Sequence, residues 1–255
     1  MVKITFMGAG STVFARNVLG DCMCTPALCD AEIALYDIDG ERLNDSYVIL
    51  SAINKNVNEG RASIHTYLGV PNRKDALRDA DFVVNAIQVG GYDPCTITDF
   101  EVPKKYGLDQ TIADTLGIGG IMRALRTIPV ILEIAEMMKK YAPGAKLINF
   151  TNPSGIITEA VARYTDVPVV GLCNCPITAF MRTKKHMGWE NDDVFFDYFG
   201  LNHLAFIKGI YLNGKDVTDE AFEKILDHPN CDEMLGYAFN KRQALAMRVL
   251  PVSYL

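Results

Sequence analysis

The chain has 255 residues, of which 49% are hydrophobic and 22% charged, and its formal net charge is −6. That length suffices for one large domain and part of a second. Acidic and basic residues are mixed along the chain, so the charge pattern gives no support for binding to nucleic acid or to a membrane surface. It favours a small soluble ligand.

Apolar, strand-like runs alternate with helical patterns through about residue 190, which predicts an α/β fold: a Rossmann-like, doubly wound parallel sheet covered by helices on both faces. The expected strands are residues 3–7, 32–36, 63–66, 82–86, 146–149 and 169–172. The expected helices include residues 41–54, 74–80, 121–141, 155–164 and 178–187.

The character of the sequence changes near residue 190. Residues 194–199 and 205–212 are rich in aromatic side chains and predict strands, and Asn213-Gly214 is typical of a two-residue hairpin turn. We therefore expect a domain at residues 1–190 and the beginning of an α+β domain at residues 191–255. The pattern breaks off at Leu255, so this second domain is expected to be truncated.

The first predicted strand breaks into Gly8-Ala9-Gly10-Ser11, and Asp37 ends the second apolar run. Two glycines let the backbone approach a pyrophosphate, and the helix that follows directs its amide-rich N-terminus at the negative charge. Asp37 can accept hydrogen bonds from a ribose diol and favours NAD over NADP, because a 2′-phosphate would meet a carboxylate. Val13 replaces the third glycine of the usual pattern, so a plain turn between a strand and a helix stays an alternative.

Polar segments at residues 88–92, 149–153 and 173–176 follow the fourth, fifth and sixth predicted strands. Ligands of an open parallel sheet bind beyond the carboxyl ends of its strands, so we expect these segments to converge on the edge that holds Gly8. Asn152 lies where a nicotinamide and a substrate hydroxyl would meet. An asparagine that caps the following helix is the structural alternative.

Three further side chains are candidates for chemistry. Cys173 ends a predicted strand and His203 begins the next layer, and a thiolate with an imidazole can hold a divalent metal. Packing in the core is the more common role of such residues and stays the alternative. Asp114 lies among small and apolar residues of the glycine-rich loop 106–120. Burial there would raise the pKa of its carboxyl group, which suits a general acid, whereas a flexible connection is the alternative.

The N-terminus and the cysteines bear on location. Met1 runs straight into the first predicted strand without a charged and then apolar leader, and no apolar stretch approaches the length that spans a bilayer, so we expect a cytoplasmic protein. The seven cysteines form no paired CxxC motifs, which indicates neither a structural zinc site nor a disulfide framework.

Five motifs in order, at residues 8–11, 110–120, 149–153, 171–176 and 200–203, make the chain resemble glycoside hydrolase family 4. This family comprises NAD- and manganese-dependent α-galactosidases, α-glucosidases and 6-phospho-glucosidases. Its members are longer, so the resemblance implies an N-terminal portion, with an NAD-binding domain at residues 1–190 and the start of the catalytic domain after it. It also implies a homo-oligomer, a dimer or a tetramer, when the protein is full length.

The resemblance implies roles for particular residues. NAD is expected to contact Gly8, Gly10, Ser11, Asp37 and Asn152. The metal, Mn²⁺ or another divalent ion, is expected on Cys173 and His203. The substrate is expected to contact Asn152 and Asn174, with Asp114 as catalytic acid and Tyr254 as catalytic base.

The implied hydrolysis is an exception to the usual mechanism with two carboxylates. NAD⁺ accepts a hydride from C3 of the sugar, the resulting ketone acidifies the proton on C2, and the metal stabilises the enolate as a Lewis acid. Tyr254 removes the C2 proton, and Asp114 assists departure of the leaving oxygen. Water then adds and the hydride returns.

Charge favours an unphosphorylated substrate. A phosphate monoester needs a cation, usually an arginine, and by alignment Thr96 stands where phospho-specific members have one. We therefore expect an α-hexoside, an α-galactoside first, with a 6-phospho-glucosidase as the alternative. Two other hypotheses stay open: a 2-hydroxy-acid dehydrogenase of the lactate or malate type, and a truncated chain that binds NAD without turnover.

Overall fold

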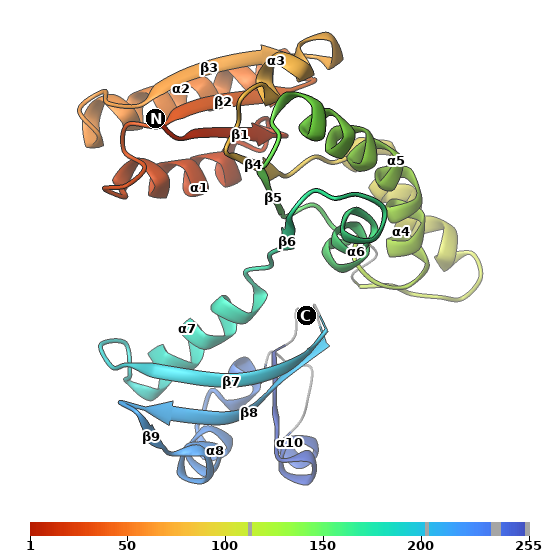
Figure 1. Ribbon diagram of the computed structural model, residues 1–255. Helices are drawn as coiled ribbons and strands as arrows, with labels where there is room; N and C mark the ends of the chain where they lie inside the picture. The colour runs from red at the N-terminus through yellow and green to blue at the C-terminus, as the bar shows by residue number, and fades with distance from the viewer. Residues whose placement is uncertain (112–113, 202–203, 236–240, 253–255) are drawn as a thin grey trace. The chain divides into compact units, whose positions relative to one another are not determined.

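The structure, a computed structural model, describes residues 1–111, 114–201, 204–235 and 241–252 (Figure 1). The chain divides into two compact units, Met1–Leu172 and Cys173–Leu255. His203 and Tyr254, the expected metal ligand and base, lie outside the described residues.

The first unit is built on a parallel six-stranded sheet with the strand order β3-β2-β1-β4-β5-β6. The order reverses between β1 and β4, which is the switch point where doubly wound sheets bind ligands. This arrangement confirms the predicted fold class. The strands are β1 (Lys3–Met7), β2 (Glu32–Asp37), β3 (Ser63–Leu68), β4 (Phe82–Asn85), β5 (Lys146–Asn149) and β6 (Val169–Gly171).

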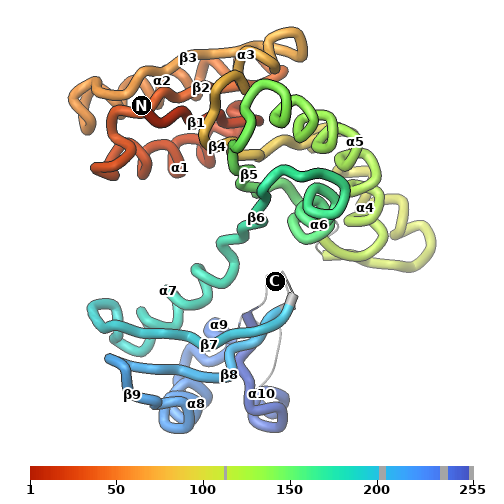
Figure 2. Tube along the Cα trace, viewed as in Figure 1, coloured from red at the N-terminus to blue at the C-terminus, as the bar shows by residue number. Residues whose placement is uncertain are grey.

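Helices pack on both faces of this sheet, as Figures 1 and 2 show. Successive residues of a strand point to opposite faces, so Phe6 joins one core and Met7 the other, both fully buried. The first core is completed by α1 (Thr12–Cys24) and α2 (Gly40–Val57). The second is completed by α3 (Arg73–Leu77), α5 (Gly117–Tyr141) and α6 (Ser154–Tyr164).

The segment between β4 and β5 is more helical than the sequence indicated. A turn of π-helix, η2 (Gly91–Thr96), leads into α4 (Ile97–Lys104), and neither was among the expected helices. Helix α5 begins at Gly117 instead of residue 121. Glycine disfavours helix on propensity alone, but a Cβ on Gly120 would lie 2.6 Å from the backbone carbon of Thr115, so close packing requires glycine there.

The second unit contains an antiparallel sheet with the order β10-β8-β7, and β9 pairs with β8. It confirms both aromatic strands and the Asn213-Gly214 turn, which joins Leu212 to Lys215. Its described elements are α7 (Cys175–Met187), β7 (Val194–Leu201), β8 (Leu204–Leu212), β9 (Lys215–Asp216), α8 (Thr218–Asp227), α9 (Cys231–Met234), α10 (Lys241–Met247) and β10 (Leu250–Val252).

The boundary between the units falls at Leu172, earlier than the expected residue 190. Helix α7 explains the difference, because its Ala179 belongs to the core of the second unit. Arg182 of the same helix also donates its Nη1–H to the carbonyl of Glu233, at 2.7 Å. Among the described helices, none is both long and apolar enough to cross a membrane.

The turn between β8 and β9 yields a stability test. Asn213 has a φ of +51° and Gly214 a φ of +77°, as this type of turn requires. An alanine in the left-handed region costs about 1–2 kcal/mol, so Asn213→Ala should lower the free energy of unfolding by about that amount in urea denaturation. Asn213→Gly loses the same side-chain contacts but keeps the conformation, so its loss should be smaller; equal losses would contradict this explanation.

Candidate active site

The turn after β1 fits between the two neighbouring strands only because Gly8 has no side chain. Gly8 has a φ of +90°, and a Cβ there would lie 2.6 Å from the carbonyl oxygen of Ala86, just after β4. On the other side, the N–H groups of Gly8 and Ala9 both donate to the carbonyl of Tyr36 in β2, at 2.9 Å. The predicted glycine turn is therefore fixed at the switch point of the sheet.

Asp37 is bonded directly to the glycine turn. Its Oδ2 accepts the N–H of Gly10 at 2.6 Å, and its Oδ1 accepts the N–H groups of Ile38 and Asp39 at 2.8 and 3.0 Å. A carboxylate has about four acceptor positions, so one remains for a ligand hydroxyl. A Cβ on Gly10 would lie 2.8 Å from the same Oδ2, which explains the second glycine.

Helix α1 points an uncapped N-terminus at this turn. Ser11 is the residue before the helix, and its side chain makes no capping hydrogen bond. The first turn of α1 contains no acidic residue. The helix dipole and free amide groups are therefore available to an anion, and together with Gly8, Gly10 and Asp37 they fit the diphosphate and ribose of a dinucleotide.

A buried polar network lies at the carboxyl ends of β4 and β5, and the sequence did not single out its centre, Asn85. The Nδ2 of Asn85 donates to Asn149 Oδ1 at 2.9 Å and to Thr151 Oγ1 at 3.0 Å, and Asn85 is fully buried. Its Oδ1 has no hydrogen-bond partner in the described structure. The signal that could have found it is an asparagine closing an otherwise apolar strand.

Two of the expected site residues, Asn152 and Asp114, are in direct contact. Asn152 Nδ2 donates to Asp114 Oδ2 at 3.2 Å, and the Thr115 hydroxyl donates to Asp114 Oδ1 at 3.3 Å. The capping alternative for Asn152 is wrong, because Pro153 precedes α6 and no side chain caps that helix. Both Asn152 and Asp114 are partly exposed, so a ligand can reach them.

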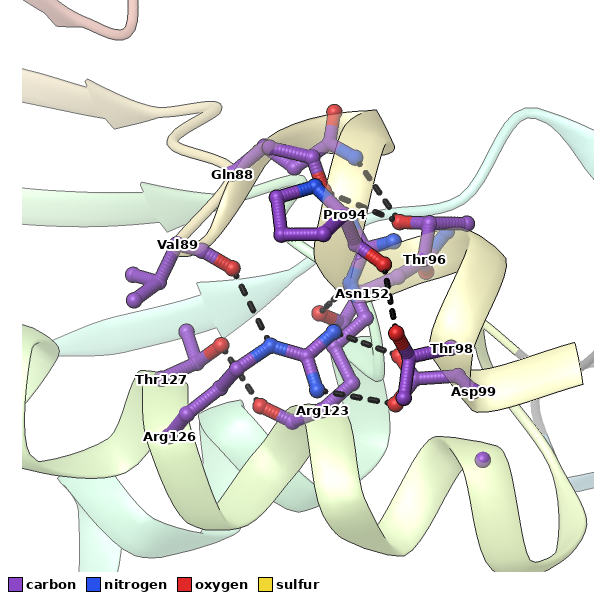
Figure 3. A network of polar contacts seen from close by, with 12 residues as sticks. Gln88, Val89, Pro94, Thr96, Thr98, Asp99, Arg123, Arg126, Thr127 and Asn152 are labelled. Carbon is purple, nitrogen blue, oxygen red and sulfur yellow. Dashed lines mark hydrogen bonds and ion pairs between the residues drawn. The ribbon is translucent and has the colours of Figure 1, made fainter. Parts of the chain in front are cut away.

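Two arginines of α5 hold the loops after β4 and β5 (Figure 3). Arg123 Nε donates to the carbonyl of Asn152 at 3.1 Å. Arg126 Nε donates to the carbonyl of Val89 at 3.1 Å, and its two Nη groups bind both carboxylate oxygens of Asp99 in α4, at 3.0 and 2.5 Å. Sequence reasoning assigned no role to this pair, which joins residues far apart in the chain.

The environments of these arginines differ. The hydrogen bonds that Arg126 donates to Asp99 raise the pKa of Arg126 above its ordinary value. Burial lowers the pKa of Arg123; the charge of Asp114 opposes that shift, while the charge of Arg126 reinforces it. Arg126 thus has one carboxylate and one carbonyl group as partners, whereas Arg123 is a cation held mainly by one carbonyl group.

Thr96 is an uncharged, buried member of the loop after β4. Gln88 Nε2 donates to its hydroxyl at 3.1 Å, and the hydroxyl donates to the carbonyl of Gly91 at 3.2 Å (Figure 3). The cation near this loop is Arg126, and Asp99 neutralises it. The described part of the loop therefore offers a phosphate no unpaired positive charge.

In the second unit, Cys173 and Asn174 precede α7. Cys173 Sγ accepts the N–H of Cys175 at 3.5 Å, and hydrogen bonding to Cys173, followed by burial, raises the pKa of the Cys175 thiol. Asn174 occupies the N-cap position without a side-chain capping bond. No cluster of three His, Cys, Asp or Glu side chains suited to a metal is found among the described residues.

Comparison with known proteins places these features in context. The model of the family 4 glycosyl hydrolases matches residues 3–188. An α-galactosidase of Bacillus subtilis (strain 168) is 48% identical over 220 residues, which are 86% of this chain and 50% of the relative. A probable 6-phospho-beta-glucosidase of the same strain is 36% identical over 99% of this chain and 57% of the relative. The chain thus spans about half the length of the curated relatives it matches.

Solved structures give the same picture. A 6-phospho-beta-glucosidase from Thermotoga maritima aligns with a TM-score of 0.82 at 30% identity, over 98% of this chain and 57% of that one. The same enzyme, solved with manganese, NAD⁺ and glucose-6-phosphate, aligns with a TM-score of 0.80 at 30% identity over the same shares of both chains. A lactate dehydrogenase from Eimeria maxima, with a TM-score of 0.59 at 16% identity over 95% of this chain and 65% of that one, shares the fold alone.

Gly8→Ala tests the close approach at the switch point. The new Cβ collides with the Ala86 carbonyl, so the free energy of unfolding should fall by about 2–4 kcal/mol in urea denaturation. Gly144→Ala is the matched control, since Gly144 has a φ of +89° with nothing within 4 Å of its Cβ position. It carries the same conformational strain without the collision, so equal losses for the two variants would refute the steric explanation.

Asp99→Asn tests the ion pair that joins α4 to α5. The Asp99 side chain is 5% exposed, and removing its charge leaves Arg126 without its anion, so unfolding in urea should become easier by about 2 kcal/mol. The comparison variant is Glu159→Gln, whose ion pair with Arg163 is 70% and 69% exposed and should contribute little. Similar behaviour of both variants would show that the Asp99 pair is equally dispensable.

Proposed function

The chain belongs to family 4 of the glycosyl hydrolases, and from that premise we propose that it is a portion of an NAD- and divalent-metal-dependent glycosidase acting on an unphosphorylated α-hexoside, an α-galactoside first. Residues 1–172 form the NAD-binding part, and residues 173–255 begin the substrate-binding part. The observation that carries the proposal is the dinucleotide-shaped turn at Gly8 and Asp37 beside the Asn152 and Asp114 pair.

NAD⁺ supplies a hydride acceptor when bound, and the divalent metal supplies a Lewis acid. Among the residues of this chain, Gly8, Gly10 and Ser11 receive the diphosphate, and Asp37 accepts a ribose hydroxyl with its remaining acceptor position. Cys173 and His203 would hold the metal. The N–H of Cys175 and the N-terminus of α7 suit a negatively charged sulfur at Cys173.

The proton-transfer roles fall on three side chains. Asn152 orients the substrate while its Nδ2 holds Asp114 through the hydrogen bond at 3.2 Å. Asp114 gives a proton to the leaving glycosidic oxygen, and Tyr254 takes the proton from C2 of the sugar. Asn174 contacts the substrate from the start of α7. These assignments follow the family resemblance, and the Asn152 and Asp114 contact supports the part that lies in the first unit.

The substrate choice rests on charge and on relatedness. Thr96 is neutral and Arg126 of α5 is already bonded to Asp99, so neither of these two residues at the loop after β4 offers a phosphate a free cation. The B. subtilis α-galactosidase, at 48% identity, supports the same choice. The 6-phospho-glucosidase alternative is supported by the B. subtilis relative at 36% identity and by the T. maritima structures.

The proposal includes a cytoplasmic location and a homo-oligomer, a dimer or a tetramer, for the full-length protein. Helix α5 supports a further contact surface, because four apolar side chains at helical spacing are between 46% and 61% exposed: Ile118, Ile121, Met122 and Leu125. Light scattering coupled to size exclusion on the full-length protein measures the assembly.

The assay that tests the substrate class uses the full-length protein with NAD⁺ and Mn²⁺. We expect turnover of p-nitrophenyl α-galactoside and little turnover of the 6-phospho-glucosides. EDTA should abolish the activity and Mn²⁺ should restore it, because the metal supplies the Lewis acid.

Each other outcome assigns a different function. Turnover confined to phosphorylated substrates would replace our choice by the 6-phospho-glucosidase. Net accumulation of NADH on a 2-hydroxy acid, insensitive to EDTA, would assign a dehydrogenase instead. Binding of NAD⁺ without turnover of any substrate would leave only the dinucleotide-binding part of the proposal.

A further inference from the structure

Arg123 is almost completely buried and is fixed along one edge of its guanidinium group. The residue is 8% exposed, and its Nε donates to the carbonyl of Asn152 at 3.1 Å. The hydroxyl of Thr127, one turn further along α5, donates to the carbonyl of Arg123 at 2.7 Å. The position of the side chain beneath the Asn152 segment is therefore well defined (Figure 3).

The other edge of this guanidinium has no partner among the described residues. Among the residues that the structure describes, neither Nη of Arg123 makes a hydrogen bond or an ion pair, whereas both Nη groups of Arg126 bind Asp99. A guanidinium carries five N–H donors, and buried donors are almost always matched. Arg123 uses one.

These free donors remain open to a ligand. Among the described residues, the fully buried side-chain polar atoms without a hydrogen bond are Asn58 Oδ1, Arg73 Nη1, which pairs with Glu133 at 3.2 Å, and Asn85 Oδ1; the Nη atoms of Arg123 are not among them. They are thus unpartnered without being sealed off. Arg123 is more than nine-tenths buried, and its Nη groups are donors for which the described residues provide no acceptor.

Asp114 is close but does not serve as that acceptor. Its charge acts on the pKa of Arg123, yet its oxygens accept from Asn152 Nδ2 and the Thr115 hydroxyl, and it forms no ion pair with Arg123. The carboxylate and the guanidinium therefore stand near each other with separate partners. The acceptor for Arg123 has to come from outside the described residues.

We infer that Arg123 is a substrate-binding residue whose Nη groups donate to oxygen atoms of the sugar bound beside Asn152 and Asp114. The inference rests on the proposed function, because it takes a hexoside as the ligand. The edge of a guanidinium spans two neighbouring oxygens, which matches adjacent hydroxyl groups on a sugar ring. Its Nε edge meanwhile fixes Asn152, so one side chain positions both the substrate and the residue that contacts it.

The test measures sugar binding by calorimetry on the full-length protein loaded with NAD⁺ and Mn²⁺. The ligands are galactose and its four monodeoxy analogues, lacking the hydroxyl at C2, C3, C4 or C6. Arg123→Gln should weaken galactose binding by about 10- to 100-fold, as expected for a lost charged hydrogen bond. That loss should become smaller for the two analogues that each lack one of the adjacent hydroxyl groups bound by Arg123, and should stay the same for the other two.

Controls separate binding from folding. Arg123→Lys keeps the positive charge but lacks the two Nη groups, so it should fold and recover only part of the affinity for galactose. If Arg123→Gln does not fold, the measurements with the deoxy analogues are made on Arg123→Lys. Arg163→Gln on α6, where Arg163 is 69% exposed, should leave sugar binding unchanged. Arg163→Gln should leave the affinity for NAD⁺ unchanged, and the Arg123 variants should lose less affinity for NAD⁺ than for galactose.

The remaining outcomes overturn the inference. An equal loss for galactose and every analogue shows that Arg123 acts only on the fold of the site. A loss of NAD⁺ affinity with unchanged sugar affinity assigns the cation to the dinucleotide instead. If the wild-type protein binds no galactose, the proposed substrate class fails, and this inference fails with it.

Discussion

Arg123 and Arg126 lie one turn apart on α5, and between them they hold the loops that follow β4 and β5. The C-terminal half of the same helix lies in the apolar core through Ile131 and Ile134, so the guanidinium groups project from a rigid base. The polar edge of the first unit depends on this helix. Buried cations require hydrogen-bond acceptors. All three nitrogens of the Arg126 guanidinium donate to Val89 or Asp99, whereas only Nε of Arg123 has an acceptor among the described residues, the carbonyl of Asn152.

The conformation of the glycine turn after β1 depends on close packing as much as on charge. The missing side chain of Gly8 lets the turn lie between Tyr36 and Ala86, and Asp37 then fixes Gly10 through a backbone hydrogen bond at 2.6 Å. Asp37 therefore stabilises the turn even when no ribose is bound. One residue type satisfies both requirements, because a carboxylate has acceptor positions to share.

The local sequence pattern predicted those features that depend on residues close together in the chain. The six strands of the first unit, both aromatic strands of the second and the Asn213-Gly214 turn follow from apolar periodicity and turn chemistry, and the association of Asp37 with the glycine turn follows from a known motif. The pairing of Asp99 with Arg126 spans 27 positions in the chain and leaves no local trace.

The same reasoning accounts for the other differences. Asn85 meets Asn149 across 64 positions, and α7 belongs with the second unit because of contacts that only the folded chain makes.

Adjacent residues of β1 serve separate interiors, with Phe6 packed among α1 and α2 and Met7 among the helices of the opposite layer. Gly8 directly follows β1, so the same strand contributes to both cores of the first unit and positions the glycine turn. A substitution in either layer that displaces β1 would therefore also displace the turn at Gly8, so the two cores and the turn have to be compatible with one strand position.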